Sequence, residues 1–214
     1  MVTLEDSRMI GCVGVLLLLI SLIRPLLHNP FPLLIQYNFP FHNIPSLFFR
    51  TVLLGIMLGI SGLVLILVAV KCISDVVKDP QVFKNMIIAV ITGFIGITSS
   101  FLMAESYMVP LFGLPVSISS ILTVLMTLWV ISWITFTISG VFIKRSYDRV
   151  AELTSVNLFK AVGFLHLLGG ILFVEFGGIV LFVAKVIEGV SFFILPKRCK
   201  LIASSLKTAS YETH

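Results

Sequence analysis

The sequence predicts an all-α integral membrane protein, a bundle of six transmembrane helices with both termini in the cytoplasm. Of its 214 residues, 58% are hydrophobic and only 12% are charged, and its mean hydropathy is +1.12. A soluble domain is nearer to half apolar and one-quarter charged, so lipid must be the solvent for much of this surface. Six apolar segments follow one another, and the basic residues gather on one side of them. We therefore expect a single polytopic membrane domain over residues 1–214.

The predicted spans follow the apolar segments in chain order. They cover about residues 9–27, 51–70, 86–103, 116–143, 158–174 and 179–195. The first apolar run, Met9–Ile23, has only 15 residues, and it reaches the ~20 that a span needs by continuing through Pro25 to Leu27. No small-residue cleavage pattern follows it, which indicates a retained helix rather than a secretory signal. Five spans, with this segment only interfacial, is the alternative.

Residues 24–50 form the predicted first extracytoplasmic loop, and their composition differs from that of the spans. They contain five prolines and six aromatic residues: Pro25, Pro30, Pro32, Pro40 and Pro45, and Phe31, Tyr37, Phe39, Phe41, Phe48 and Phe49. Proline at this density opposes a regular helix, because each ring removes a donor and clashes with the preceding turn. Aromatic rings favour the headgroup region. We expect an interfacial loop; a cap folded over the mouth of the bundle is the alternative.

Five glycines predict close packing between helices. They are Gly55, Gly59 and Gly62 on the second span, and Gly163 and Gly170 on the fifth. Spacings of three, four or seven residues keep small side chains on one helix face, where the backbone of another helix can approach.

The fourth span, residues 116–143, carries the most hydroxyl groups. They form two strips: Ser120, Thr123 and Thr127, and Ser132, Thr135 and Ser139. Such hydroxyls commonly bond the carbonyl four residues earlier or a neighbouring helix; a polar permeation path is the functional alternative. Trp129 and Trp133 lie deeper than an aromatic belt would place them, so we expect them to pack against helices.

Two polar segments connect spans on the predicted cytoplasmic side. In residues 71–85, Asp79 and Pro80 predict a helix start, with Asp as the N-cap and Pro at the first helical position. Residues 144–157 are charged and compatible with a helix, which we expect to lie along the cytoplasmic surface.

The distribution of basic residues predicts the orientation. Twelve of the fifteen fall on one side of the six spans, whereas the other side has only Arg24 and Arg50, and Lys185 lies within a span. The positive-inside rule then places both termini, and the tail 197–214, in the cytoplasm. The net charge of +5 is thus a topology signal and an attraction to anionic lipid headgroups, not a nucleic-acid footprint.

The ionisable residues His166, Lys185 and Glu188 are embedded in the last two spans, and we predict that they share one layer. Measured from the turn at 175–178, they lie about 12, 10 and 15 Å deep. An ionisable group within a span costs roughly 2.5–3.5 kcal/mol, so each should face protein or water and have a partner. In the structural interpretation, Lys185 pairs with Glu188 at i, i+3. In the functional interpretation, Glu188 carries a proton or ion, tuned by Lys185 and relayed by His166.

Other signatures of chemistry are absent from the sequence. Cys12, Cys72 and Cys199 have no disulfide or metal spacing and are expected to be free thiols. No zinc, haem, nucleotide or catalytic motif occurs, so we expect no enzyme activity, no metal and no cofactor.

These features favour a non-enzymatic scaffold or accessory subunit of a membrane complex. The expected partners are membrane lipid and other membrane subunits or a second copy, with no nucleic acid. A small transporter or channel that uses the polar layer is the alternative. A lipid-modifying or redox membrane enzyme is the third hypothesis, and it would need a cofactor or carboxylate cluster that the sequence does not show.

The runs AVKCISDVVKDPQVFKNMIIAVI and FIKRSYDRVAELTSVNLFKAVGFLHLLGGIL, with the closing VSFFILP, resemble a family of archaeal multi-pass membrane proteins of unassigned function. The resemblance covers roughly Arg8–Pro196 and is weaker in the Pro/Phe-rich loop. It implies the architecture described above and an archaeal plasma membrane. It brings no catalytic residues.

Overall fold

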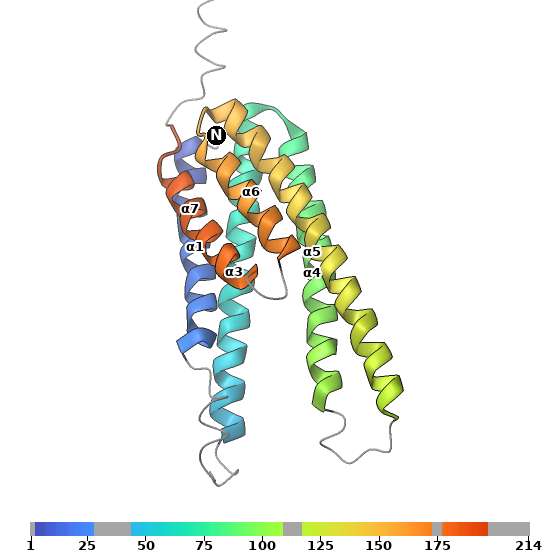
Figure 1. The fold of residues 1–214 in the computed structure, drawn as a ribbon. Coiled ribbons are helices and arrows are strands. Elements are labelled where there is room, and N and C mark those ends of the chain that lie inside the picture. The colour runs from blue at the N-terminus through green and yellow to red at the C-terminus, as the bar shows by residue number, and fades with distance from the viewer. Residues whose placement is uncertain (1–2, 28–43, 109–116, 173–176, 197–214) are drawn as a thin grey trace, which may run out of the picture. The chain divides into compact units, whose positions relative to one another are not determined.

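The computed structural model describes residues 3–27, 44–108, 117–172 and 177–196 (Figure 1). Six helices follow one another in these ranges: α1 (Leu4–Leu27), α3 (Ile44–Val77), α4 (Pro80–Met108), α5 (Ile118–Thr154), α6 (Leu158–Ile171) and α7 (Gly177–Phe193). No β-strand occurs among the described residues, so the predicted all-α class is confirmed.

Three of the described helices are long and apolar enough to cross a membrane. The qualifying segments are Leu53–Val77, Pro80–Met103 and Ser119–Thr154, of 25, 24 and 36 residues. At 1.5 Å per residue even the shortest is about 36 Å long, which exceeds the ~30 Å hydrocarbon core of a bilayer. α6 is also apolar, but its 14 residues extend only about 21 Å.

The non-helical prediction for residues 24–50 was wrong at its C-terminal end. α1 ends at Leu27, which is the end predicted for the first span, whereas α3 begins at Ile44, within the Pro/Phe-rich segment. Pro45 is tolerated there because it lies in the first turn of α3, where a backbone N–H has no intrahelical partner in any case. The segment between the two helices, residues 28–43, lies outside the described residues, as does its predicted interfacial position.

The helix start predicted at Asp79 and Pro80 is confirmed. α3 ends at Val77, Lys78 has a φ of 56°, and α4 begins at Pro80. The backbone N–H of Gln81 donates to the Asp79 carboxylate at 2.9 Å, which satisfies one of the free amides at the helix start.

The structure corrects the predicted position of the charged segment 144–157. The helix is present, but it is the continuation of α5, which runs unbroken over 37 residues to Thr154. No Gly or Pro lies between Gly140 and Thr154 to interrupt it. α5 ends only where Ser155 takes the left-handed conformation, with a φ of 61°.

A reciprocal cap begins α1. The Asp6 carboxylate accepts from the Thr3 backbone N–H at 2.8 Å, and the Asp6 N–H donates to the Thr3 hydroxyl at 3.2 Å. The hydrogen bonds from the backbone and side chain of Thr3 hold the pKa of Asp6 below its usual value.

The chain divides into two compact units, each described here by itself. The terminal unit comprises Met1–Val77 and Lys185–His214, and the central unit comprises Lys78–Ala184. α7 therefore contributes its first part to the central unit and the rest to the terminal unit. The prediction of one domain over the whole chain stays a prediction.

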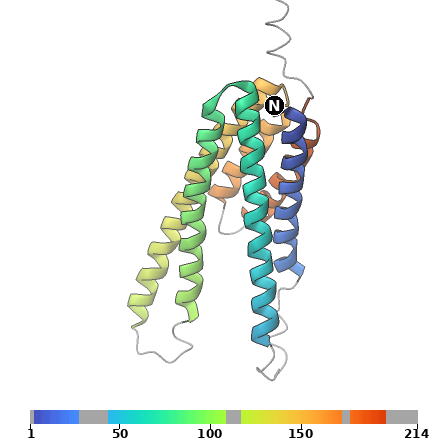
Figure 2. The same cartoon turned by 180° about the vertical axis from the view of Figure 1, so that it is seen from behind.

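In the terminal unit, α1 and α3 cross at two glycines (Figure 2). A Cβ added at Gly62 would lie 2.6 Å from the Gly14 carbonyl oxygen, and one at Gly14 would lie 2.9 Å from the Gly62 carbonyl oxygen. Both separations are shorter than van der Waals contact, so the two backbones meet only because neither position carries a side chain.

In the central unit, α4 and α5 lie side by side, joined by three buried serines at seven-residue spacing: Ser132, Ser139 and Ser146. The hydroxyls of Ser139 and Ser146 donate to the carbonyls of Ala89 and Val82, each at 2.8 Å. Ser132 accepts from the Ser100 hydroxyl at 3.2 Å. Seven residues are close to two helical turns, so the three hydroxyls follow one face of α5 along α4.

Candidate functional site

Glycines on α6 set how closely this helix approaches α5 in the central unit, and so position His166. A Cβ added at Gly163 would lie 2.9 Å from the Lys144 Cα, and one at Gly170 would lie 2.6 Å from the Phe136 carbonyl oxygen. Both distances are to backbone atoms of α5, which cannot swing aside as a side chain can. The two predicted packing glycines of this span therefore lie at a backbone-to-backbone contact.

His166 lies within this contact and is 4% exposed. A Cβ added at Gly140 on α5 would be 3.0 Å from the His166 carbonyl oxygen. The ring Nδ1 lies 2.9 Å from the Val162 carbonyl oxygen. A carbonyl only accepts, so Nδ1 carries the hydrogen, and the lone pair of the neutral ring is on Nε2. His166 thus has a fixed tautomer, in which Nε2 is the basic atom.

Sequence reasoning missed Tyr147, which contacts the same site. It is 1% exposed, although it lies in the charged segment KRSYDR. Its ring centroid is 6.3 Å from that of His166, in an edge-on arrangement, and 5.4 Å from that of Phe159. Tyr147 follows Gly140 by seven residues, so extending the packing face of α5 into the charged segment would have found it.

Lys185 and Glu188 form an ion pair along α7, in the part that belongs to the terminal unit. The Lys185 Nζ lies 2.7 Å from the Glu188 Oε2, at the i, i+3 spacing. The side chain of Glu188 is 0% exposed and that of Lys185 is 18% exposed. A buried pair loses much of its Coulomb energy to desolvation, but removing one partner leaves the other charge uncompensated and costs about 3–5 kcal/mol.

The α7 face beside this pair packs on α1. A Cβ added at Gly189 would lie 3.3 Å from the Val15 side chain, and one at Gly11 would lie 2.4 Å from the Phe192 ring. The thiol of Cys12 lies 3.7 Å from the Gly189 carbonyl oxygen, at which it donates a weak hydrogen bond. The end of α7 therefore lies beside the beginning of α1.

The predicted polar layer combines His166 from the central unit with Lys185 and Glu188 from the terminal unit. The structure fixes the surroundings of each part within its own unit, and the layer as a whole stays a prediction.

The three predicted packing glycines of α3 have different surroundings. Gly62 meets the backbone of α1, as described above. A Cβ at Gly59 would lie 3.4 Å from the Ser21 hydroxyl, which is ordinary contact, and one at Gly55 would meet no atom of the described side chains and helices within 4 Å. Gly55 is therefore open toward the part of the chain that the structure describes.

The two hydroxyl strips of α5 also differ. Thr123 and Thr127 are exposed, and their hydroxyls donate to carbonyls of their own helix at 2.9 and 2.8 Å. Ser132 and Ser139 are instead buried against α4. Packing against helices was predicted for Trp129 and Trp133, and both are exposed, at 39% and 40%. Trp133 nevertheless contacts α6, because its indole N–H donates to the Ile171 carbonyl at the end of that helix, at 3.0 Å.

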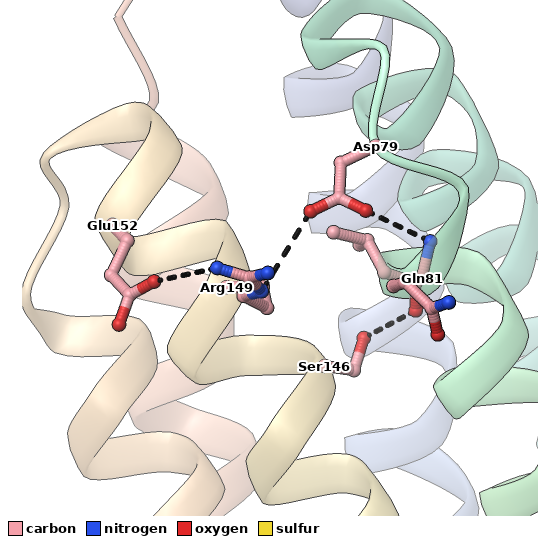
Figure 3. Close-up of polar contacts among 6 residues, drawn as sticks. Asp79, Gln81, Ser146, Arg149 and Glu152 are labelled. Atoms are coloured by element: carbon pink, nitrogen blue, oxygen red, sulfur yellow. Dashed lines mark hydrogen bonds and ion pairs between the residues drawn. The ribbon is translucent and has the colours of Figure 1, made fainter.

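An ion pair joins α5 to the residue that precedes α4 (Figure 3). Arg149 lies 3.8 Å from the carboxylate of that residue, Asp79, and within α5 it lies 3.4 Å from the carboxylate of Glu152. The Arg149 side chain is 54% exposed, so these pairs contribute only roughly 0–1 kcal/mol to the free energy of unfolding.

Metal-binding chemistry has little support in the described part of the chain. No group of three His, Cys, Asp or Glu side chains comes together there. Cys12 and Cys72 are free thiols, and Cys199 lies outside the described residues.

Comparisons with known proteins agree with the resemblance seen in the sequence. The family model "Protein of unknown function (DUF996)" matches residues 58–186, a range that contains His166 and Lys185. The Uncharacterized protein MJ1644 of the archaeon Methanocaldococcus jannaschii is 33% identical over 152 residues, which cover 68% of this chain and 84% of the relative. No solved structure matches. The predicted membership of an archaeal family without an assigned function is confirmed, and the chain belongs to the DUF996 family.

Proposed function

We propose that this chain is a non-enzymatic multi-pass protein of the cell membrane, with both termini in the cytoplasm, that serves as a scaffold or accessory subunit of a membrane complex. The observation that carries the proposal is that α4 and α5 each have a polar face and an apolar face. Serines on the faces where the two helices meet form hydrogen bonds between them, whereas large apolar side chains on the other faces are exposed. The exposed set includes Ile91, Phe94, Ile97 and Phe101 on α4, and Leu122, Met126 and Val130 on α5.

This surface favours contact with lipid and with other membrane helices. Three polar groups of the central unit have partners within the chain: Ser139 and Ser146 bond carbonyls of α4, and Trp133 bonds the end of α6. A surface of apolar side chains, with these hydroxyls turned toward the neighbouring helix, suits a protein that holds others in place. The open position at Gly55 adds a place where another helix backbone could approach α3.

Purification in a mild detergent from the native membrane tests the scaffold proposal. We expect one or a few membrane proteins to copurify at fixed stoichiometry and to crosslink to this chain. In the variant Gly55→Leu the new side chain occupies a position that is open toward the described residues, so we expect it to reduce copurification while leaving helicity unchanged. Met57→Leu, at a residue that is 58% exposed, is the matched control. Consistent isolation of this chain alone would contradict the proposal.

Proton or ion coupling is a second candidate, favoured by one observation. Glu188 is a fully buried carboxylate held by Lys185 at 2.7 Å, and buried ionisable groups in membrane helices frequently mark ion paths. Proton flux into liposomes, compared between the wild-type protein and Glu188→Gln, tests this role. A flux that does not exceed the background of empty vesicles, in either protein, would eliminate the candidate.

A further inference from the structure

We infer that α6 and the start of α7 form a re-entrant hairpin. It enters the membrane from the side where α5 ends, turns near the bilayer midplane, and returns to the same side. The last two of the six predicted spans are then one half-depth insertion. The inference concerns topology and stands independently of the scaffold proposal.

Helix length is the first support. α6 has 14 residues, about 21 Å, against a hydrocarbon thickness of ~30 Å. α5 has 37 residues, about 55 Å. Figure 1 shows α6 beside only one part of α5, the part toward the C-terminal end of α5. A helix of this length cannot carry the chain across the bilayer.

The register of α6 along α5 shows where the hairpin stops. α6 packs on α5 from Tyr147, beside Phe159, past Lys144, opposite Gly163, and its last contact is at Trp133, opposite Ile171. Lys144 is the first charged residue after the apolar part of α5, so it marks the headgroup boundary. Trp133 is 11 residues further into the membrane, about 16 Å, which is close to half of a ~30 Å core.

A long part of α5 continues beyond that level. From Trp133 back to Ile118 there are 15 more residues, about 22 Å, and α6 does not extend along them. α7 starts at the same level as the end of α6, since a Cβ added at Gly177 would lie 2.7 Å from the Gly169 carbonyl oxygen. The end of α6 and the start of α7 therefore lie about halfway along α5.

The carbonyls at the end of α6 have the protein partners that a buried membrane position requires. No water is available at the midplane, so a helix end is tolerated there only when other groups satisfy its backbone. Ile171 accepts from the Trp133 indole at 3.0 Å, Leu172 accepts from the Gly177 N–H at 2.9 Å, and Leu168 accepts from the Leu172 N–H at 2.9 Å. If the end of α6 were exposed to water, water could satisfy the Ile171 carbonyl, and the hydrogen bond from the Trp133 indole would not be needed.

The hairpin changes the depth assigned to the ionisable residues. His166 is five residues from the end of α6, about 8 Å from the turn toward the cytoplasm. Along α7, Glu188 is 11 residues from Gly177, about 16 Å. His166 then lies between the midplane and the cytoplasmic headgroups, and Glu188 lies near the level of those headgroups. Burying an ionisable group costs less at either depth than at the membrane centre.

Spin-label depth measurements on the full chain in liposomes test the hairpin. In a background with Cys12, Cys72 and Cys199 replaced by alanine, single cysteines are placed at exposed positions of two helices. They are Gly178, Val186 and Ile194 in and after α7, and Ser119 and Val130 as controls on α5. Gly178 accepts a label, because a Cβ there meets no atom of the described residues within 4 Å.

With a re-entrant hairpin, the label at Gly178 is as deep as the label at Val130, about 15 Å below the headgroups, and depth decreases through Val186 to Ile194. Six full spans give the opposite profile: Gly178 is at headgroup level, like Ser119, and Val186 is deepest. That second profile would overturn the inference. Helicity and gel-filtration elution verify that each variant folds, and Ile179, which is 68% exposed, replaces Gly178 if that variant does not.

Discussion

The two sides of α5 are built differently, although both are buried in the same unit. Toward α4, the side chains of Ser132, Ser139 and Ser146 separate the two helix backbones and form hydrogen bonds to α4. Toward α6, glycines allow the two helix backbones to be in direct contact. Removing a serine hydroxyl would break a hydrogen bond without changing the distance between the helices, whereas any side chain added at one of these glycines would push the helices apart. The α6 side should therefore be the more sensitive to small changes.

The largest effect is expected from Gly170→Ala. Its new methyl group would lie 2.6 Å from the Phe136 carbonyl oxygen, so α6 would have to move away from α5. Overpacking of this kind costs about 1–3 kcal/mol, which outweighs the gain of roughly 1 kcal/mol in helix propensity. Thermal or denaturant unfolding in detergent, followed by circular dichroism, measures the loss.

Gly169→Ala is the matched control for this prediction. Its methyl group would also be close to a neighbour, at 2.8 Å, but the atoms at that distance are Cγ and Cδ2 of the Leu181 side chain and not backbone atoms. The Leu181 side chain can shift while the two helix backbones stay in place, so the loss should be smaller than that of Gly170→Ala. Equal decreases in the free energy of unfolding for Gly169→Ala and Gly170→Ala would contradict the prediction, because they would mean that the α5–α6 backbone contact is no less tolerant of a methyl group than the Leu181 side chain.

The second effect is expected from Trp133→Phe, which keeps an aromatic ring and removes the N–H bonded to Ile171. An unsatisfied carbonyl away from water costs about 1–3 kcal/mol. The free energy of unfolding should therefore fall by an amount within this range, and the decrease should be smallest if water can hydrogen-bond to the Ile171 carbonyl. Trp129→Phe is the control, since Trp129 is exposed to a similar degree, at 39%. A loss confined to Trp133→Phe would support the midplane position of the turn.

Sequence reasoning located the apolar segments, the Asp79–Pro80 helix start and the packing glycines of α6, because each depends on local chemistry. It placed the end of the fourth helix wrongly, because the charges after Ile143 mark where lipid ends and not where a helix ends. Only a breaker or a cap ends a helix, and the first conformational break is at Ser155.

The depth of the α6–α7 turn could not be predicted in the same way. Hydropathy shows that residues 158–195 avoid water, but a half-depth hairpin and two short spans have the same composition. The register of α6 against Lys144 and Trp133 distinguishes them, and that is a tertiary contact. Tyr147 was missed for a related reason: its charged neighbours hid a buried packing position.

A smaller effect is expected from Ser139→Ala, on the α4 side of α5. The variant loses the bond to the Ala89 carbonyl and keeps the helix spacing. Hydrogen bonds of this kind between membrane helices average about 0.6 kcal/mol, with a maximum near 1.7. Thr127→Ala controls for helix propensity, because the Thr127 hydroxyl bonds only its own helix in the described structure. A loss larger than that of Gly170→Ala would reverse the comparison between the two sides.

The smallest effect is expected from Arg149→Ala. Arg149 reaches Asp79 at 3.8 Å and Glu152 at 3.4 Å, but its side chain is 54% exposed. Water and salt screen such pairs, so removing both should cost no more than about 1 kcal/mol at low salt and almost nothing at 1 M salt, where the screening length is about 3 Å. Unfolding measured at both salt concentrations gives the difference. A large loss at low salt that disappears at 1 M salt would mean that the ion pairs, rather than the buried serines, hold α4 to α5, because hydroxyl bonds inside the protein are insensitive to screening.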